Sequence, residues 1–312
     1  MRIGIVATAV GIASLLFLSR RAACDPPGFA FLEVPAGARA AALGGAYASL
    51  AQDADAAFWN PAGLSAVHGI QISGSHVEYV QKLRHDQFAV AGQGLGGGLA
   101  GSVRALYSEP IEARDEIGNL TGTWGSYDLE MGLAYGRRVG PDLSVGGTAQ
   151  LVRERIADAS ASTYAFGAGA VWSPPSITGV RLGLSVHNLG PAARYDFDGG
   201  PGAPVGLPAA VQAGGSWQLV MAHGTALRAA LEGRFTRGRS GIGMMGLEIG
   251  TLGGPKGAGA AFLRAGLRVN DETASLSFGA GYTLAGLRLD YAFVPFRLDL
   301  GDTHRISFIA QF

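Results

Sequence analysis

The chain of 312 residues contains a single cysteine, Cys24. One cysteine excludes an intramolecular disulfide framework and a cysteine-based metal site. The six histidines lack the spacing of metal ligands, and the glycine-rich runs lack the context of a phosphate-binding loop. No serine and histidine can be nominated as a nucleophile and its base. We therefore predict no metal, no cofactor and no catalytic residues, and we expect that the protein is not an enzyme.

Charged residues are also scarce. They make up 15% of the chain, and the 24 basic side chains balance the 24 acidic ones, whereas soluble domains carry about 25% charged residues. A chain without a basic excess is not expected to bind nucleic acid. The hydrophobic content of 48% excludes a disordered chain. The 50 glycines show no repeat at every third position, which excludes collagen, and they disfavour a mostly helical fold. An all-β protein or a membrane protein remains.

Long apolar runs are absent after the first one, which extends from Ile3 to Ser19. Arg2 precedes this run and small residues close it, so residues 1–24 are predicted to be a signal peptide cleaved near Cys24. Arg20 and Arg21 leave an uncleaved membrane anchor open as an alternative. A lipid attached to Cys24 is a second alternative, although Arg21 stands where a lipidation motif would carry leucine or a similar residue. No later segment is long and apolar enough for a transmembrane helix. An exported chain of this kind can cross a membrane only as a closed β-barrel.

From about residue 69 onward, apolar and polar residues alternate in runs of about ten, separated by turn residues. Alternation with a period of two places the two sets on opposite faces of a sheet. Fourteen runs are predicted to be strands, an even number as in bacterial outer-membrane barrels: 69–80, 84–94, 97–109, 125–138, 141–155, 161–173, 178–188, 207–220, 224–237, 241–251, 260–270, 273–285, 286–296 and 303–312.

A soluble β-sandwich is the alternative. Aromatic residues near the ends of the apolar faces favour a barrel with interfacial girdles. The predicted fold class is therefore all-β, a transmembrane antiparallel barrel of about fourteen strands with a small N-terminal helical hatch in its lumen. The predicted segments are the signal peptide 1–24, the hatch segment 25–68 and the barrel 69–312. The long connections 111–123 and 189–206 are expected to be extracellular loops.

The last strand ends in alternating apolar residues. Ile306, Phe308 and the terminal Phe312 resemble the signal that the barrel-insertion machinery reads. We expect this machinery and the lipid of a Gram-negative outer membrane as partners.

The segment before the barrel is too rich in alanine for a strand. Asn60 followed by Pro61 is typical of a helix start, and we expect two short helices or turns that plug the barrel mouth. Phe58 and Trp59 either line an apolar pocket or pack the plug against the wall. The candidate hatch and ligand-contacting residues are Gly44, Gly45, Phe58, Trp59, Asn60, Pro61 and Gly63.

Several runs at the two ends of the chain resemble the PorV/PorQ family. They are residues 31–33, 37–40, 43–46 and 53–64 near the N-terminus, and residues 290–296 and 300–307 in the last hairpin. The run Asn60-Pro61-Ala62-Gly63 also resembles the hatch of FadL-type fatty-acid channels.

This resemblance implies a fourteen-stranded outer-membrane barrel of the FadL-like superfamily. PorV-like members work with the type IX secretion machinery, which would make secretion proteins and their cargo the partners. FadL-like members instead pass hydrophobic small molecules, often through a side opening in the wall. We expect the first role, with the second as the alternative. A structural porin without specific cargo is a third, weaker alternative.

Overall fold

The computed structural model describes residues 27–79, 82–197, 199–221, 224–251, 259–297 and 301–312. The predicted signal peptide and Cys24 lie outside these residues.

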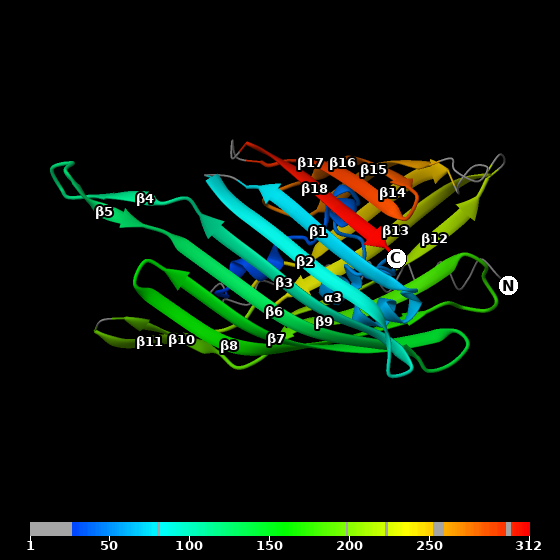
Figure 1. The fold of residues 1–312 in the computed structure, drawn as a ribbon, viewed down its shortest axis with the longest axis horizontal. Helices are drawn as coiled ribbons and strands as arrows, with labels where there is room; N and C mark the ends of the chain where they lie inside the picture. The colour runs from blue at the N-terminus through cyan, green and yellow to red at the C-terminus, as the bar shows by residue number, and fades with distance from the viewer. Residues whose placement is uncertain (1–26, 80–81, 198, 222–223, 252–258, 298–300) are drawn as a thin grey trace.

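Fourteen antiparallel strands form a closed barrel. Each strand pairs with the barrel strand before it and the one after it, and β1 with β18 completes the circle (Figure 1). The barrel strands are β1 (Ile70–Glu78), β2 (Leu83–Gly94), β3 (Gly97–Ser108), β6 (Ser126–Arg138), β7 (Leu143–Ile156), β8 (Ala159–Trp172), β9 (Val180–Leu189), β12 (Ala210–Val220), β13 (Thr225–Thr236), β14 (Ile242–Thr251), β15 (Ala260–Val269), β16 (Leu276–Leu284), β17 (Leu287–Pro295) and β18 (Asp302–Gln311).

The predicted fold class is confirmed, and each predicted range overlaps one barrel strand with ends that differ by three residues or fewer. The larger differences have local causes. The strand predicted from residue 207 begins at Ala210, after Pro208, which has no N–H to give to the ladder. The strand predicted from residue 273 begins at Leu276, because the Asp271 carboxylate holds the backbone N–H of Thr273 at 2.7 Å in a turn.

The two long connections contain hairpins. β4 (Ile111–Arg114) pairs with β5 (Leu120–Trp124) in a separate sheet, and β10 (Ala193–Phe197) pairs with β11 (Gly200–Val205) beside the edge of β8. Both hairpins project from the same end of the barrel (Figure 1). We call this end the distal end. The opposite, proximal end carries the start of β1 and the C-terminus, where Ile70 and Phe312 exchange two backbone hydrogen bonds of 3.2 and 2.9 Å.

The barrel wall is apolar outside and polar inside. On β6, Met131 and Leu133 point outward and are 55% and 72% exposed, whereas Asp128 and Glu130 point inward and are buried. This pattern is the reverse of that in a soluble protein, and it is typical of a wall that faces lipid. Among the described residues, no helix is long and apolar enough to cross a membrane.

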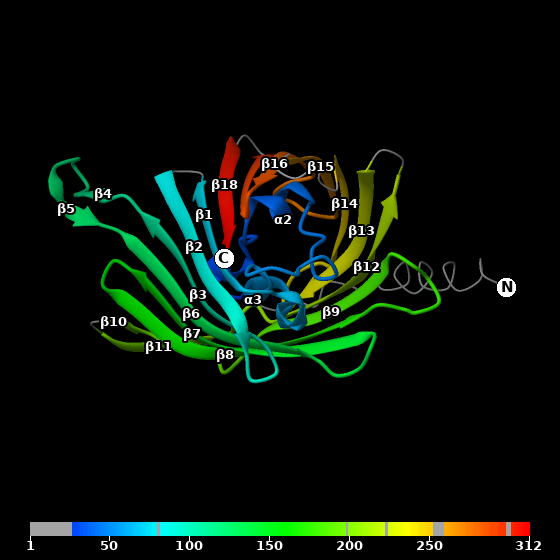
Figure 2. The ribbon, with the colours of Figure 1, turned by 45° about the vertical axis from the view of Figure 1, so that its right-hand side comes forward.

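The lumen is filled by the segment that precedes β1 (Figure 2). From residue 27 onward, the segment contains two 3-10 helices and two short α-helices, and almost all of its residues from Ala36 to Leu64 are buried. The elements are η2 (Ala30–Glu33), α2 (Ala38–Ala42), α3 (Ala56–Trp59) and η3 (Pro61–Ala66). We call residues 37–66 the hatch core and residues 28–36 the strap. The strap lies near the distal hairpins, since Gly28 N–H donates to Gly206 O at 3.1 Å, and η3 lies against the proximal halves of β6, β7 and β8.

Glycines on the inner wall allow the hatch backbone to approach the strands. A Cβ atom on Gly136 would overlap the Pro61 carbonyl, and one on Gly266 would overlap the backbone of Gly44. Other inward glycines face the hatch backbone or its Cβ atoms in the same way, namely Gly98, Gly146, Gly183, Gly246 and Gly279, and Gly169 faces the side chains of Asn60 and Pro61. The many glycines of the wall therefore make space for the hatch core.

Replacing Gly136 by valine should push η3 away from the wall. We expect the free energy of unfolding to fall by about 1–3 kcal/mol, as for other overpacked sites, and the hatch to become more sensitive to protease. Urea unfolding and limited proteolysis of the refolded barrel measure both effects. Gly101→Val is the matched control, because a Cβ atom on Gly101 meets nothing within 4 Å. Equal losses in both variants would contradict the proposed fit.

Candidate functional site: the hatch and the cavity beside it

Phe58 and Trp59 lie on α3 and are buried between the hatch and the wall. The Trp59 indole N–H donates to Ala36 O at 2.9 Å, and its ring meets the Tyr47 ring edge-on at 5.7 Å. The Arg104 guanidinium from β3 lies over the Phe58 ring, 5.4 Å from its centre. Both predicted residues therefore pack the hatch, and both also line a cavity.

This cavity lies between the strap, α3 and strands β3, β9 and β13. It contains about 20 Å³ of free space, which is room for a water molecule. Its lining is apolar on the hatch side and polar on the wall side: Leu32, Val34, Pro35, Ala36, Phe58, Trp59, Arg104, His187, Asn188 and Arg234. A larger molecule would fit only after the strap or the hatch core has moved.

Asn60 joins two parts of the hatch core to each other and to strand β8 of the wall. Its side-chain oxygen accepts from the Ala62 N–H at 3.2 Å, which caps η3, and Pro61 takes the first position of this helix. Its amide nitrogen donates to Ala48 O within the hatch at 2.8 Å and to Ala170 O on β8 at 3.2 Å. Fully buried, Asn60 fixes the turn that brings α3 and η3 to the proximal wall.

The predicted hatch glycines form turns. Gly44 and Gly45 follow α2 with φ angles of 67° and 85°, in the region that favours glycine. Gly44 O accepts from the Arg268 guanidinium at 2.9 Å, and Gly45 O accepts from the Gln212 side chain at 3.0 Å. Gly63 lies so close to Ala51 that a Cβ atom would overlap the Ala51 carbonyl. These residues shape the hatch and do not line the cavity beside Trp59.

A buried carboxylate, Glu248 on β14, holds the hatch core to the wall. Arg39 of α2 binds both of its oxygens, at 2.9 and 3.0 Å. Arg228 of β13 and Arg264 of β15 each reach one oxygen at 2.6 Å. One carboxylate therefore joins the hatch to two neighbouring strands through bonds that are stronger than neutral ones.

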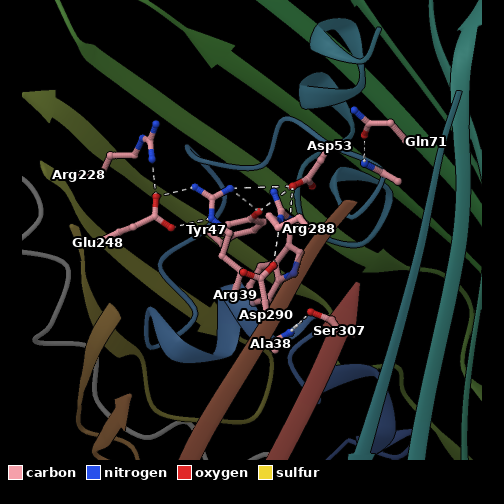
Figure 3. A network of polar contacts seen from close by, with 12 residues as sticks. Ala38, Arg39, Tyr47, Asp53, Gln71, Arg228, Glu248, Arg288, Asp290 and Ser307 are labelled. Atoms are coloured by element: carbon pink, nitrogen blue, oxygen red, sulfur yellow. Dashed lines mark hydrogen bonds and ion pairs between the residues drawn. The ribbon is translucent and has the colours of Figure 1, made fainter. Parts of the chain in front are cut away.

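The network continues to β17 (Figure 3). Arg264 also pairs with Asp290 at 2.8 Å, and Asp290 pairs with Arg288 at the same distance. Arg288 then reaches Asp53 of the hatch at 2.8 Å, and Asp53 accepts from the Tyr47 hydroxyl at 3.2 Å. The chain of charges begins and ends on the hatch core, which is thus attached to the wall at two points.

Two neighbouring acids of the hatch have opposite pKa shifts. Burial raises the pKa of Asp53, but the Arg288 and Arg39 guanidiniums lower it, and the result lies below the ordinary value. Burial and the charge of Asp53 raise the pKa of Asp55 from 3.8 to about 7, although Arg288 and a hydrogen bond from Ser73 oppose this shift. Asp53 is therefore the charged partner of the network.

The sequence did not predict this network or the polar side of the cavity. Its wall members are inward residues of the alternating strands, and nothing in the alternation distinguishes them from the other polar residues of the wall. Alternation places Arg228, Glu248 and Arg288 on the inner face, but it does not say which strands become neighbours across the lumen or which hatch residue meets them.

The predicted barrel-insertion residues lie elsewhere. Ile306, Phe308 and Phe312 are on or beside β18, point away from the lumen and are exposed. None of them contacts the hatch residues described above, and their role in insertion stays a prediction.

Comparisons with known proteins agree with this architecture. Residues 8–148 match the family model of an uncharacterised protein family, UPF0164. No curated protein sequence matches the chain. The toluene transporter TbuX of Ralstonia pickettii has a TM-score of 0.59 at 14% identity, over 88% of this chain and 98% of that chain.

Two further solved structures are similar. The toluene transporter TodX of P. putida has a TM-score of 0.60 at 12% identity, over 88% of this chain and 98% of that chain. The monoaromatic hydrocarbon channel CymD has a TM-score of 0.57 at 12% identity, over 88% and 97%. These proteins are transporters or channels rather than enzymes. At such identities, the similarity concerns the fold.

Replacing Glu248 by glutamine should loosen the hatch, since three arginines lose the negative carboxylate that they share. We expect the free energy of unfolding to fall by about 3–5 kcal/mol, as when one partner of a buried ion pair is removed. Urea unfolding measures this loss, and ion conductance in planar bilayers measures any leak through the lumen.

The control for this variant is Glu112→Gln on the distal hairpin. Glu112 pairs with Arg114 at 2.6 Å, but both side chains are more than half exposed, so we expect a loss of at most about 1 kcal/mol. If Glu248→Gln were no worse than this control, the network would not hold the hatch.

Asp55 should make stability depend on pH. Because its pKa is higher in the folded protein than its ordinary 3.8, its contribution is fully present below about pH 4 and is lost as pH rises through about 7. Asp55→Asn should remove this part of the pH dependence. The difference in urea midpoint between wild type and variant should change between about pH 4 and 7.5 and be constant above. A difference that is constant over the whole range would contradict the assigned pKa shift.

Proposed function

We propose that the protein is an outer-membrane channel that admits small hydrophobic molecules, with the hatch core as its closed gate. The observation that carries this proposal is the aromatic cavity between the hatch and the wall. Phe58 and Trp59 lie on its apolar side. The fold shared with toluene and monoaromatic hydrocarbon transporters supports this function.

The wall beside this cavity has an irregularity in its strand pairing. The β8–β9 register shifts between Phe166 and Ala168, and β9 ends at Leu189. Asn188 has a φ of 57°, which turns the backbone of β9 out of the regular strand. Asn188 and its neighbour His187 both line the cavity. A molecule that enters the cavity is therefore close to a weak seam in the wall, and we propose this seam as its lateral exit.

Locking the seam tests this route. Ala168 and Val186 are cross-strand partners of β8 and β9, and a disulfide between Ala168→Cys and Val186→Cys, in a Cys24→Ser background, would prevent the strands from separating. We expect toluene uptake into proteoliposomes to fall at least about fivefold in the oxidised form and to recover after reduction, since opening the seam would no longer be possible.

The matched control joins Leu133→Cys to Ala149→Cys, which are partners of β6 and β7 where the register is regular. This disulfide should leave uptake unchanged. Uptake that is insensitive to the seam lock would exclude the lateral exit, and the absence of any protein-dependent toluene uptake would exclude the channel function.

A second candidate is a partner in protein secretion or surface display, as the PorV/PorQ resemblance implies. The observation that favours it is the β4–β5 hairpin. Ile117 and Leu120 on this hairpin are 84% and 60% exposed, and Trp124 is also exposed. Such apolar side chains on a projecting hairpin are suited to contact another protein. The uptake measurement separates the two candidates, because this second role requires no toluene transport.

A further inference from the structure

The strap is held differently from the hatch core. Phe29, Phe31 and Leu32 are buried in an apolar cluster against β7, β8 and β10, and the Gly28 N–H donates to Gly206 O, just after β11, at 3.1 Å. The only carboxylate of the strap, Glu33, pairs with Arg239 at 2.8 Å, and the Arg239 side chain is 46% exposed, so solvent screens this pair. Apolar packing rather than a network of buried ion pairs therefore holds the strap, and its displacement would break none of the ion pairs of the hatch core.

Two buried arginines donate to backbone carbonyls of the strap. Arg104 of β3 donates to Leu32 O, and Arg305 of β18 donates to Pro35 O, both at 3.1 Å. Arg305 is 2% exposed, and no carboxylate lies within 4.0 Å of it among the described residues. A buried guanidinium that has only a neutral acceptor is costly. The Pro35 carbonyl on Arg305 thus occupies a place where an anionic oxygen would bind more strongly, and the Leu32 carbonyl takes a donor of Arg104 that its ion pair with Glu130 does not use.

A third arginine, Arg234 of β13, faces the cavity. Within the described part of the chain, its side chain has no hydrogen bond and no ion pair, and its attraction to Glu33 is shared with Arg239. Arg104 is neutralised by Glu130. The cavity therefore carries an excess of positive charge on its wall side, whereas its hatch side offers the rings of aromatic residues.

We propose, building on the channel function above, that this cavity binds the carboxylate of a small aromatic acid and that the strap is its lid. The carboxylate takes the place of the Leu32 carbonyl on Arg104 and pairs with Arg234. The ring of the ligand takes the place of the Leu32 side chain beside Phe58 and Trp59. A neutral hydrocarbon would leave Arg234 without a partner, so the site selects the charged molecule.

Benzoate and toluene, which differ in a carboxylate and a methyl group, test the charge selection. We expect the purified barrel to bind benzoate more tightly than toluene in equilibrium dialysis. Arg234→Gln should weaken benzoate binding at least about tenfold, because a charge-assisted pair is lost, and should change toluene binding less than twofold. Arg234→Lys should restore part of the benzoate affinity. Arg194→Gln, which removes an exposed arginine of β10, should have no effect.

Each outcome of this experiment decides the proposal. Unchanged benzoate binding in Arg234→Gln, or an equal loss of both ligands, overturns it. Toluene binding without benzoate binding overturns the charged site and leaves the channel function standing. If neither ligand binds to the wild type, the channel function fails together with this site.

The lid is tested by fixing the strap to β11. A Cβ atom on Gly28 would lie 3.6 Å from that of Val205, within the range of disulfides, about 3.5–4.5 Å. In a Cys24→Ser background, the oxidised Gly28→Cys, Val205→Cys protein should bind benzoate with an association rate at least about tenfold lower, and reduction should restore the rate. An unchanged rate in the oxidised protein would show that the strap is not the lid.

Discussion

The backbone of the hatch core lies directly against the backbone of the barrel wall, and this fit depends on glycine at the points of contact. Gly136 faces the Pro61 carbonyl, and Gly266 faces Gly44. A barrel of fourteen strands is too wide for its own side chains to fill. Close backbone approach on several sides lets a hatch of small residues, mainly alanine and glycine, close the lumen. The glycines weaken the strands of the wall, because glycine is a poor strand former. The closed ladder, in which every strand is paired on both sides, offsets this loss of stability.

Ion pairs also hold the hatch core in the barrel. The inner wall carries acids and arginines that would be costly to bury singly, and they are paired with one another and with the hatch. Glu248 links Arg39 to two strands, and Asp53 links the other end of the hatch to Arg288. These bonds fix where the hatch core sits in the barrel. The strap has one ion pair, Glu33 with Arg239, and is otherwise held by buried apolar side chains and by two arginines that donate to its backbone carbonyls. The two parts of the segment therefore differ in what holds them.

The different anchoring suggests how a closed barrel can still admit a ligand. The cavity beside Trp59 is lined by the strap and by β9, whose pairing with β8 shifts in register, while ion pairs fix the hatch core in the lumen. Movement of a short segment at the distal end would then expose a binding site without opening a pore through the lumen. Under the proposed function, selectivity arises at this site, from the balance of aromatic rings and arginines.

The sequence by itself determined the strands and the faces of the wall. Alternation with a period of two is a local property, so each run shows which of its residues face lipid and which face the lumen. Turn residues mark the ends of each run. The sequence also placed the cap at Asn60 and the turn at Gly44, because both depend on neighbouring residues. Only the tertiary structure decided which inward residues meet. Arg39 and Glu248 are separated by 209 positions, and Leu32 and Arg104 by 72. Such pairs depend on how the closed barrel and the enclosed hatch are positioned relative to each other, and no local pattern contains that information.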